Sequence, residues 1–128
     1  MTSLLISLVL AITPATVTLD QILDAIAIVE SNNNPNAVGD QGRAIGAYQL
    51  HKIYVDDVNR IAKTKYKYQD RYDPIKSRNM VALYLMYYGK QIPIHQWPRL
   101  HNGGPRGHTK NTTLPYQKKI NHIIGEQT

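Results

Sequence analysis

The 128-residue sequence contains no cysteine, so it can form neither a disulfide framework nor a thiolate metal site. Its five histidines show no HExxH pair or other recognised zinc spacing, and we expect neither a metal nor a cofactor. A phosphate-binding glycine loop, a dinucleotide fingerprint and the Gly-x-Ser-x-Gly nucleophile elbow are also missing. These absences argue against the common metal-dependent, nucleotide-dependent and serine-hydrolase chemistries.

The sequence also has no apolar run long enough to cross a bilayer, which takes about 20 residues. A shorter, mostly apolar run covers residues 4–12, and small residues follow it. This pattern is typical of a secretory signal peptide, although no Lys or Arg precedes the run. We therefore expect residues 1–17 to be a signal peptide, with processing between Ala15 and Thr18. The protein would then be exported to the periplasm, the cell envelope or the medium. The alternative is a first hydrophobic element of the domain itself.

Residues 1–18 carry no charged side chain, so the net charge of +6 belongs to the rest of the chain. A basic domain is attracted to polyanions, and nucleic acid, anionic lipid and the bacterial cell wall all qualify. In residues 63–68 lysines alternate with tyrosines or threonine, a composition that could suit single-stranded nucleic acid. The favoured interpretation is a solvated loop between two helices, and we expect no nucleic-acid partner.

Residues 18–128 are enough for one domain with its own core. Thr18 and Gln21 form a capping-box pattern, and apolar residues at helical spacing follow them. Three asparagines and Pro35 then favour the end of this helix. The pattern therefore places Glu30 in the last turn, on or beside the apolar face.

The glycine-rich residues 39–46 predict tight turns or a small hairpin. Helical spacing predicts a second helix from Ala47 and a third that Asp73-Pro74 opens and Gly89 ends. A proline-broken loop follows, and a last helix begins near Thr113. The predicted class is α+β and mainly α, with a core of four helices and a small glycine-rich hairpin or loop region.

Glu30 has features of a general acid before any family is considered. The residues one turn back, Ile26 and Ala27, are apolar, so the side chain is expected to be partly desolvated. Desolvation and the partial negative charge of the helix C-terminus both favour a protonated carboxyl, the form that a general acid needs. On spacing alone, however, an ordinary exposed glutamate of the last turn is the favoured interpretation.

Four motifs change that balance. They are Glu30-Ser31, the Gly-x-x-Gln segment at 46–50, a stretch at 100–104 similar to Ala-Tyr-Asn-x-Gly, and a Thr-x-x-Tyr motif at 113–116. In kind and order they resemble the motifs of soluble lytic transglycosylases and goose-type lysozymes. The run at 102–107 also resembles one in invertebrate-type lysozymes. Over about residues 20–122 the chain resembles this lysozyme-like superfamily. The resemblance implies a lysozyme-like fold and cleavage of peptidoglycan glycan strands.

By the same resemblance, Glu30 is the catalytic acid/base, and six residues line or organise the sugar cleft: Ser31, Tyr48, Gln49, His101, Asn102 and Tyr116. Tyr48 stands where the family often has a methionine packed near the sugar. His101 replaces the usual tyrosine, which leaves two interpretations open, a cleft wall or a hydrogen-bonded loop histidine. Trp97, the only tryptophan, is a sugar platform or a core anchor, with the core favoured.

A second carboxylate would decide the reaction. Hydrolytic lysozymes pair the acid with another carboxylate, and Asp40, in the glycine-rich turn, is the best candidate. Asp40 also suits a simple role as a turn former, which is the favoured interpretation. Lytic transglycosylases, by resemblance, use one glutamate, which protonates the glycosidic oxygen and then acts as base on the sugar's C6 hydroxyl. The product is a 1,6-anhydro-muramic end.

The leading hypothesis is therefore a monomeric lytic transglycosylase that cuts the β-1,4 bond between N-acetylmuramic acid and N-acetylglucosamine, without stable membrane insertion after processing. The closest alternative is a hydrolytic lysozyme that uses Glu30 and possibly Asp40. A second alternative is a non-catalytic glycan-binding protein. Nucleic-acid binding is a third, and it is supported by charge alone.

Overall fold

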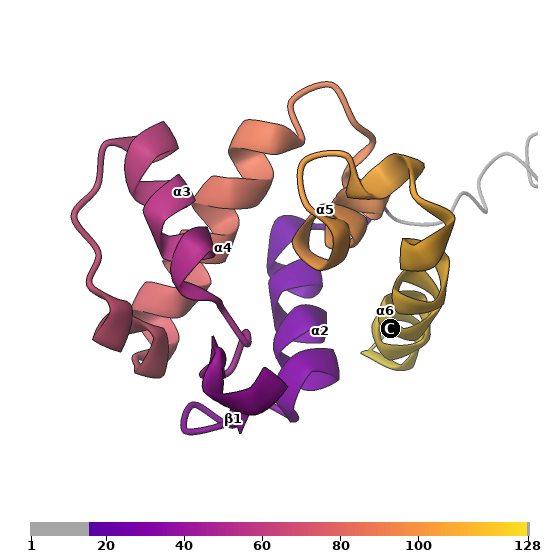
Figure 1. Ribbon diagram of the computed structural model, residues 1–128. Coiled ribbons are helices and arrows are strands. Elements are labelled where there is room, and N and C mark those ends of the chain that lie inside the picture. Colours follow the sequence, from indigo (N-terminus) through magenta and orange to yellow (C-terminus); the bar gives the residue numbers. More distant parts are fainter. Residues whose placement is uncertain (1–15, 128) are drawn as a thin grey trace, which may run out of the picture.

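The computed structural model describes residues 16–127, so the predicted signal peptide at 1–17 lies outside the described residues except for its last two positions. The described chain is mainly helical, with one small hairpin (Figure 1). Its helices are α2 (Leu19–Ser31), α3 (Lys52–Ala62), α4 (Pro74–Tyr88), α5 (Trp97–Gly103) and α6 (Leu114–Gln127). Within this part of the chain, no helix is long and apolar enough to cross a membrane. The predicted mainly α, α+β class is confirmed.

Helix α2 lies at the centre of the fold and contacts α4, α5 and α6 (Figure 1). Its apolar face is buried. The predicted capping box is present: Gln21 N donates to Thr18 Oγ1 at 3.2 Å, and Thr18 N donates to Gln21 Oε1 at 2.9 Å. Asn32 takes the left-handed conformation, with φ 53°, and ends the helix. Glu30 therefore lies in the last turn of α2, as predicted.

The glycine-rich segment forms the expected hairpin below α2 in Figure 1. Strands β1 (Val38–Gly39) and β2 (Ala44–Ile45) pair antiparallel, with Val38 opposite Ile45 and Gly39 opposite Ala44. Asp40 and Gln41 connect them in a tight turn with positive φ angles of 48° and 58°. The hairpin thus places Asp40 at its turn, away from the hydrophobic core.

Helix α3 begins at Lys52, so the predicted start at Ala47 is wrong. The intervening chain forms a turn in which Gln49 N donates to Gly46 O at 3.1 Å. Gly46 has φ 84° and Gln49 has φ 53°, conformations that an α-helix cannot contain. A Cβ atom at Gly46 would also lie 1.9 Å from the carbonyl oxygen of Arg71, so only glycine fits there.

Helix α5 forms where the sequence predicts a proline-broken loop, so the described chain has five helices rather than the predicted four. Pro98 lies in the first turn of α5, where its missing N–H costs no helical hydrogen bond. The indole N–H of Trp97 donates to the carbonyl oxygens of Gly89 at 3.1 Å and Ile92 at 2.9 Å. Trp97 also packs against the hydrophobic core, which agrees with its predicted role as a core anchor.

Helices α4 and α6 begin close to the predicted residues. Asp73 caps α4, because its Oδ1 accepts hydrogen bonds from the backbone N–H groups of the first turn at 2.9 Å, and Pro74 is the first helical residue. Helix α4 ends before Gly89. Helix α6 follows a short 3-10 turn that ends at Thr113. Its inner face buries Tyr116 and Ile120 against the rest of the core.

Candidate active site

Glu30 lies where α2, α5 and α6 meet. Its side chain is 22% exposed, and its Oε2 accepts a hydrogen bond from the hydroxyl of Tyr116 at 2.9 Å. The Nε2 atom of His101 lies 3.3 Å from the same oxygen. The other oxygen, Oε1, has no partner within the described residues. One carboxyl oxygen is therefore fixed by the protein, while the other is free to exchange a proton with a ligand.

Tyr116 donates a hydrogen bond to Glu30, and it stays protonated at neutral pH. Burial, followed by the negative charge and the hydrogen bond of Glu30, raises the pKa of Tyr116 well above its ordinary value. The phenol therefore keeps its proton throughout the neutral pH range. Because its O–H donates a hydrogen bond to Oε2, the phenol holds the carboxyl of Glu30 in one orientation.

His101 is held through both ring nitrogens, and it lies on helix α5 rather than in the predicted loop. Its side chain is only 4% exposed. Nε2 lies 3.2 Å from the carbonyl oxygen of Tyr48, and Nδ1 lies 3.2 Å from the hydroxyl of Tyr54. A carbonyl oxygen can only accept, so Nε2 carries the hydrogen, and in the neutral ring Nδ1 accepts from Tyr54. Burial raises the pKa of Tyr54 well above its ordinary value, so this donor also persists.

Ser31 connects the end of α2 to the Gly-x-x-Gln segment. Its hydroxyl lies 2.8 Å from the carbonyl oxygen of Ala47, to which it donates, and accepts from the backbone N–H of Asn34 at 3.0 Å. The residue after Ala47 is Tyr48, whose carbonyl oxygen faces His101. Ser31 therefore fixes the backbone on which the orientation of His101 depends.

Gln49 and Tyr48 stabilise the same segment. Gln49 Nε2 donates to the carbonyl oxygens of Gly46 at 3.0 Å and Ala37 at 3.3 Å, which secures the turn before α3. The Tyr48 side chain is buried, and its hydroxyl lies 3.3 Å from Nη1 of Arg78. In this conformation both side chains contact protein groups.

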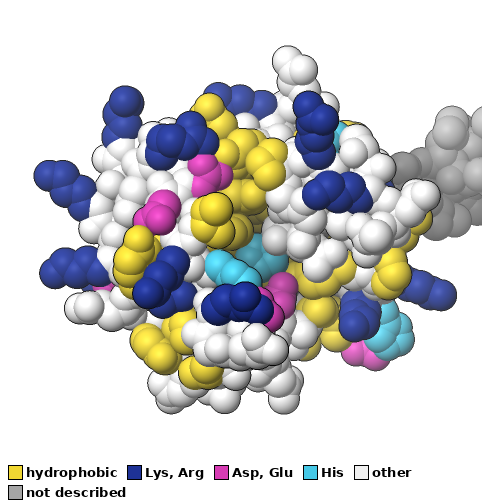
Figure 2. All heavy atoms as spheres, in the orientation of Figure 1, with side chains coloured by type: hydrophobic (Ala, Val, Ile, Leu, Met, Phe, Trp, Pro, Cys, Tyr) yellow, Lys and Arg dark blue, Asp and Glu magenta, His cyan; other side chains and the backbone are white. Residues whose placement is uncertain are grey.

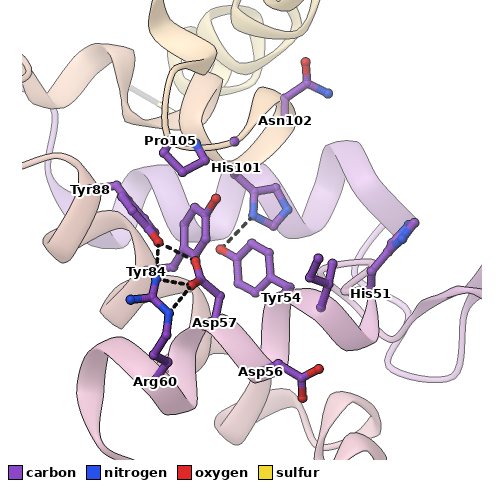
Figure 3. Close-up of a pocket in the computed structure, with 12 residues that line it drawn as sticks. His51, Tyr54, Asp56, Asp57, Arg60, Tyr84, Tyr88, His101, Asn102 and Pro105 are labelled. Atoms are coloured by element: carbon purple, nitrogen blue, oxygen red, sulfur yellow. Dashed lines mark hydrogen bonds and ion pairs between the residues drawn. The ribbon is translucent and has the colours of Figure 1, made fainter.

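Figure 3 shows a cavity of about 720 Å³ whose lining includes His101 but not Glu30. His101 connects the two, since it contacts Glu30 and also lines the cavity. Asn102 is exposed and lies at the edge of the cavity. The remaining lining residues include Tyr54, Asp56, Asp57, Arg60, Tyr84, Tyr88 and Pro105.

Three tyrosines from α3 and α4 form an aromatic surface in this cavity. The rings of Tyr54 and Tyr84 are stacked with centroids 4.2 Å apart, and Tyr88 lies 4.7 Å from Tyr84. The carboxylate of Asp57 accepts hydrogen bonds from the hydroxyl of Tyr88 and the guanidinium of Arg60. Burial and then this hydrogen bond raise the pKa of Tyr88 to about 12. Flat aromatic faces beside fixed polar groups suit a sugar, which has both apolar faces and hydroxyls.

This aromatic surface was missed in the sequence analysis. Tyr54 and Tyr84 occur at helical spacing among aliphatic residues, which indicated core positions rather than a cavity wall. The available signal was the residue type, because a buried tyrosine needs a partner for its hydroxyl. Asp57 carried no comparable signal, since the sequence places it beside another aspartate on a helix.

Asp40 has no contact with Glu30, although it bonds His51, a residue that lines the cavity. Its Oδ1 lies 3.1 Å from Nη2 of Arg43, and its Oδ2 lies 3.1 Å from Nε2 of His51. Its side chain is 46% exposed, and its backbone carbonyl accepts from Arg43 N within the turn. No contact between Asp40 and Glu30 occurs among the described residues. The structure therefore brings Glu30, His101 and Tyr116 together and leaves Asp40 at the hairpin.

Comparison with known families agrees with this arrangement. The family model for the transglycosylase SLT domain matches residues 12–124. The chain belongs to this family. Members of the SLT family are glycan-cleaving enzymes. In this SLT domain the first and last of the four motifs meet, because Tyr116 is hydrogen-bonded to Glu30 although the two residues lie 86 positions apart in sequence.

The SLT domain is also similar to a chain in the crystal structure of Aeromonas hydrophila PliI in complex with Meretrix lusoria lysozyme. The two share 24% sequence identity with a TM-score of 0.71, and the match covers 88% of this chain and 96% of that one. This likeness shows the fold, and it confirms the predicted lysozyme-like class. A search of curated proteins found no match.

Proposed function

We propose that this SLT domain is an exported, monomeric enzyme that cleaves the β-1,4 bond between N-acetylmuramic acid and N-acetylglucosamine by transglycosylation. The observation that carries the proposal is the carboxyl of Glu30, fixed at Oε2 by Tyr116, free at Oε1, and linked through His101 to a cavity with an aromatic wall. A general acid/base needs this combination of fixed orientation and one accessible oxygen.

In the proposed reaction, Oε1 of Glu30 first donates its proton to the glycosidic oxygen, and the bond from that oxygen to C1 of the muramic unit breaks. The resulting carboxylate then takes the proton of the C6 hydroxyl of the same unit. The C6 oxygen bonds to C1, which produces the 1,6-anhydro end and returns the proton to Glu30. No water is consumed, so a single carboxyl can perform both steps.

The cavity supplies the binding energy in this proposal. The stacked rings of Tyr54 and Tyr84 would support a pyranose face, and Asp57 and Asn102 would bond to hydroxyl or N-acetyl groups. The net charge of +6 draws the domain to an anionic wall. Export remains part of the proposal, and it depends on residues 1–17 acting as a signal peptide.

The test is the release of soluble fragments from purified peptidoglycan by the protein and by its Glu30→Gln variant. The variant preserves the size of the side chain while removing the transferable proton. We expect the protein to release fragments and Glu30→Gln to bind the same material without releasing them. Equal release by both would overturn the role of Glu30, and binding without release by the unaltered protein would favour the non-catalytic alternative.

Hydrolysis on the same scaffold is the second candidate, and one observation favours it. Asp57 is a carboxylate that lines the cavity, held in place by Tyr88 and Arg60. A lysozyme-type reaction would use the negative charge of Asp57 to stabilise the developing sugar cation. The product ends separate the two reactions, because hydrolysis produces reducing ends and transglycosylation produces anhydro ends.

A further inference from the structure

A second, smaller cavity of about 320 Å³ lies beside the hairpin. It is lined by Gly42, Arg43, His51, Lys52, Ile53 and Arg71. Two of these residues, His51 and Ile53, also line the larger cavity, so the two cavities adjoin. Figure 2 shows Lys and Arg side chains close to the histidines in the hollow of this face. The smaller cavity is therefore a basic extension of the proposed sugar cleft.

Arg71 is the most unusual group in this cavity, because it is a buried cation without an anion. Its residue is 7% exposed, and no carboxylate in the described chain lies within ion-pair distance of it. Its Nε donates to the carbonyl oxygen of Tyr68 at 2.7 Å, and its Nη1 donates to those of Leu50 at 3.0 Å and Arg43 at 3.3 Å. The remaining nitrogen, Nη2, has no partner among these residues. A buried guanidinium with a free N–H pair favours a carboxylate ligand.

Lys52 adds a second cation to the same wall. Its ammonium lies 5.2 Å from the ring centroid of Tyr68, and it has no carboxylate partner within the described residues. Asp40 compensates part of the charge, because it pairs with Arg43 and His51 at the turn of the hairpin. Lys52 and Arg71 are left uncompensated. A neutral sugar would leave these charges uncompensated, whereas an anionic substituent on the sugar would neutralise them.

We propose that the smaller cavity binds a carboxylate of the peptide attached to the glycan strand whose sugars occupy the larger cavity. This inference rests on the proposed function, because it takes the strand to be peptidoglycan. The muramic units of such strands carry peptides with free carboxylates, and the shared wall at His51 and Ile53 lets one bound strand reach both cavities. The enzyme would then prefer peptide-bearing strands to bare glycan.

The experiment compares three soluble substrates: peptide-bearing strands, the same strands with their peptide carboxylates converted to amides, and peptide-free strands. The variant is Arg43→Gln/Lys52→Gln, which removes two charges from the smaller cavity while neither residue lines the larger one. Arg71 is left unchanged, because its bonds to backbone carbonyls hold the hairpin in place. The matched control is Lys118→Gln/Lys119→Gln, which removes two exposed charges from α6.

We expect kcat/KM of the unaltered protein to be about tenfold higher on peptide-bearing strands than on amidated ones, as expected for one charge-assisted contact. The Arg43→Gln/Lys52→Gln variant should lose this preference, and the control should keep it. The proposal is overturned if the variant keeps the preference, or if the control loses it equally, because general attraction to charge would then explain it. Thermal unfolding checks that both variants fold, and the single Lys52→Gln variant replaces the double one if it does not.

A failure of the proposed function would look different, because no substrate of the three would then be cleaved. In that case the affinity of the Glu30→Gln variant for the three substrates, measured by calorimetry, still tests the smaller cavity. About tenfold weaker binding to the amidated strands supports the carboxylate site. Equal binding to peptide-bearing and amidated strands overturns it.

Discussion

Glu30 and Asp40 are the two carboxylates that the sequence offers for catalysis, and their surroundings differ. Glu30 is 22% exposed. Its Oε2 contacts the phenol of Tyr116 and the imidazole of His101, which come from helices far from α2 in sequence, and its Oε1 is free. Asp40 is 46% exposed, and both of its oxygens are taken by Arg43 and His51, near it in the fold. The difference teaches that a carboxylate for proton transfer is held at one oxygen only, whereas a carboxylate that stabilises a turn is paired at both.

The largest expected effect comes from substituting each carboxylate by its amide. Glu30→Gln should lower the rate of peptidoglycan cleavage by about a thousandfold, because general acid/base catalysis contributes on this order. Asp40→Asn should change the rate by less than about twofold, as expected for an exposed turn position that has no contact with Glu30. Initial rates of fragment release, with thermal unfolding as the check on folding, measure both. Comparable losses in the two variants would show that the carboxylates act as a pair.

The next effect tests how Glu30 is held. Tyr116→Phe removes the hydroxyl that donates to Oε2, and kcat should fall by about tenfold, the usual effect of losing a hydrogen bond to a charged group. KM should change little, because Tyr116 is buried under the carboxyl rather than in the cavity. The matched control is Tyr72→Phe, which removes the hydroxyl of an exposed tyrosine that lines neither cavity. An unchanged kcat in Tyr116→Phe would mean that the hydrogen bond does not orient the acid.

A smaller effect is expected at His101. His101→Leu removes the Nε2–H that faces the Tyr48 carbonyl and Glu30, and kcat should fall by about fivefold, the value of one net hydrogen bond. His101→Gln retains a donor of similar reach and should recover part of that loss. Steady-state kinetics of the two variants provide the comparison. Identical losses would show that the imidazole itself, rather than its donor group, is required.

The smallest effect concerns Tyr88, which lines the cavity. Because the folded-state pKa of Tyr88 is about 12, against 10.0 for a free tyrosine, its contribution to stability is complete below pH 10 and is lost as the pH rises through 12. The free energy of unfolding of Tyr88→Phe should therefore decline less steeply over this interval than that of the unaltered protein. Denaturant titrations at several pH values measure it, with the exposed Tyr72→Phe as control. Parallel declines in all three proteins would contradict the assignment.

The elements that sequence predicted well are those whose ends are determined locally. Thr18 and Gln21 cap α2, and Asp73 with Pro74 begins α4, so the boundaries follow from neighbouring residues. Helix α5 was missed because Pro98 suggests a break, although a proline in a first turn is tolerated.

The site residues also fall into two groups, those that a local motif identifies and those that only the packing of the fold identifies. The role of Glu30 follows from its motif, and its contact with Tyr116 joins residues that only the fold brings together. Tyr54, Tyr84 and Asp57 could not be identified as cavity residues, because their helical spacing is the same whether they face a core or a cavity. Whether a polar side chain faces a ligand depends on packing between helices, which local patterns do not encode.

The most direct test of a single-carboxyl reaction is to digest peptidoglycan with the protein in oxygen-18-labelled water and to identify the product ends by mass spectrometry. We expect 1,6-anhydro-muramic ends without the label, because Glu30 uses the sugar's own C6 hydroxyl and consumes no water. Reducing ends that carry the label would contradict this. They would assign the protein to the hydrolases, in which a second carboxylate takes part directly or by activating a water molecule.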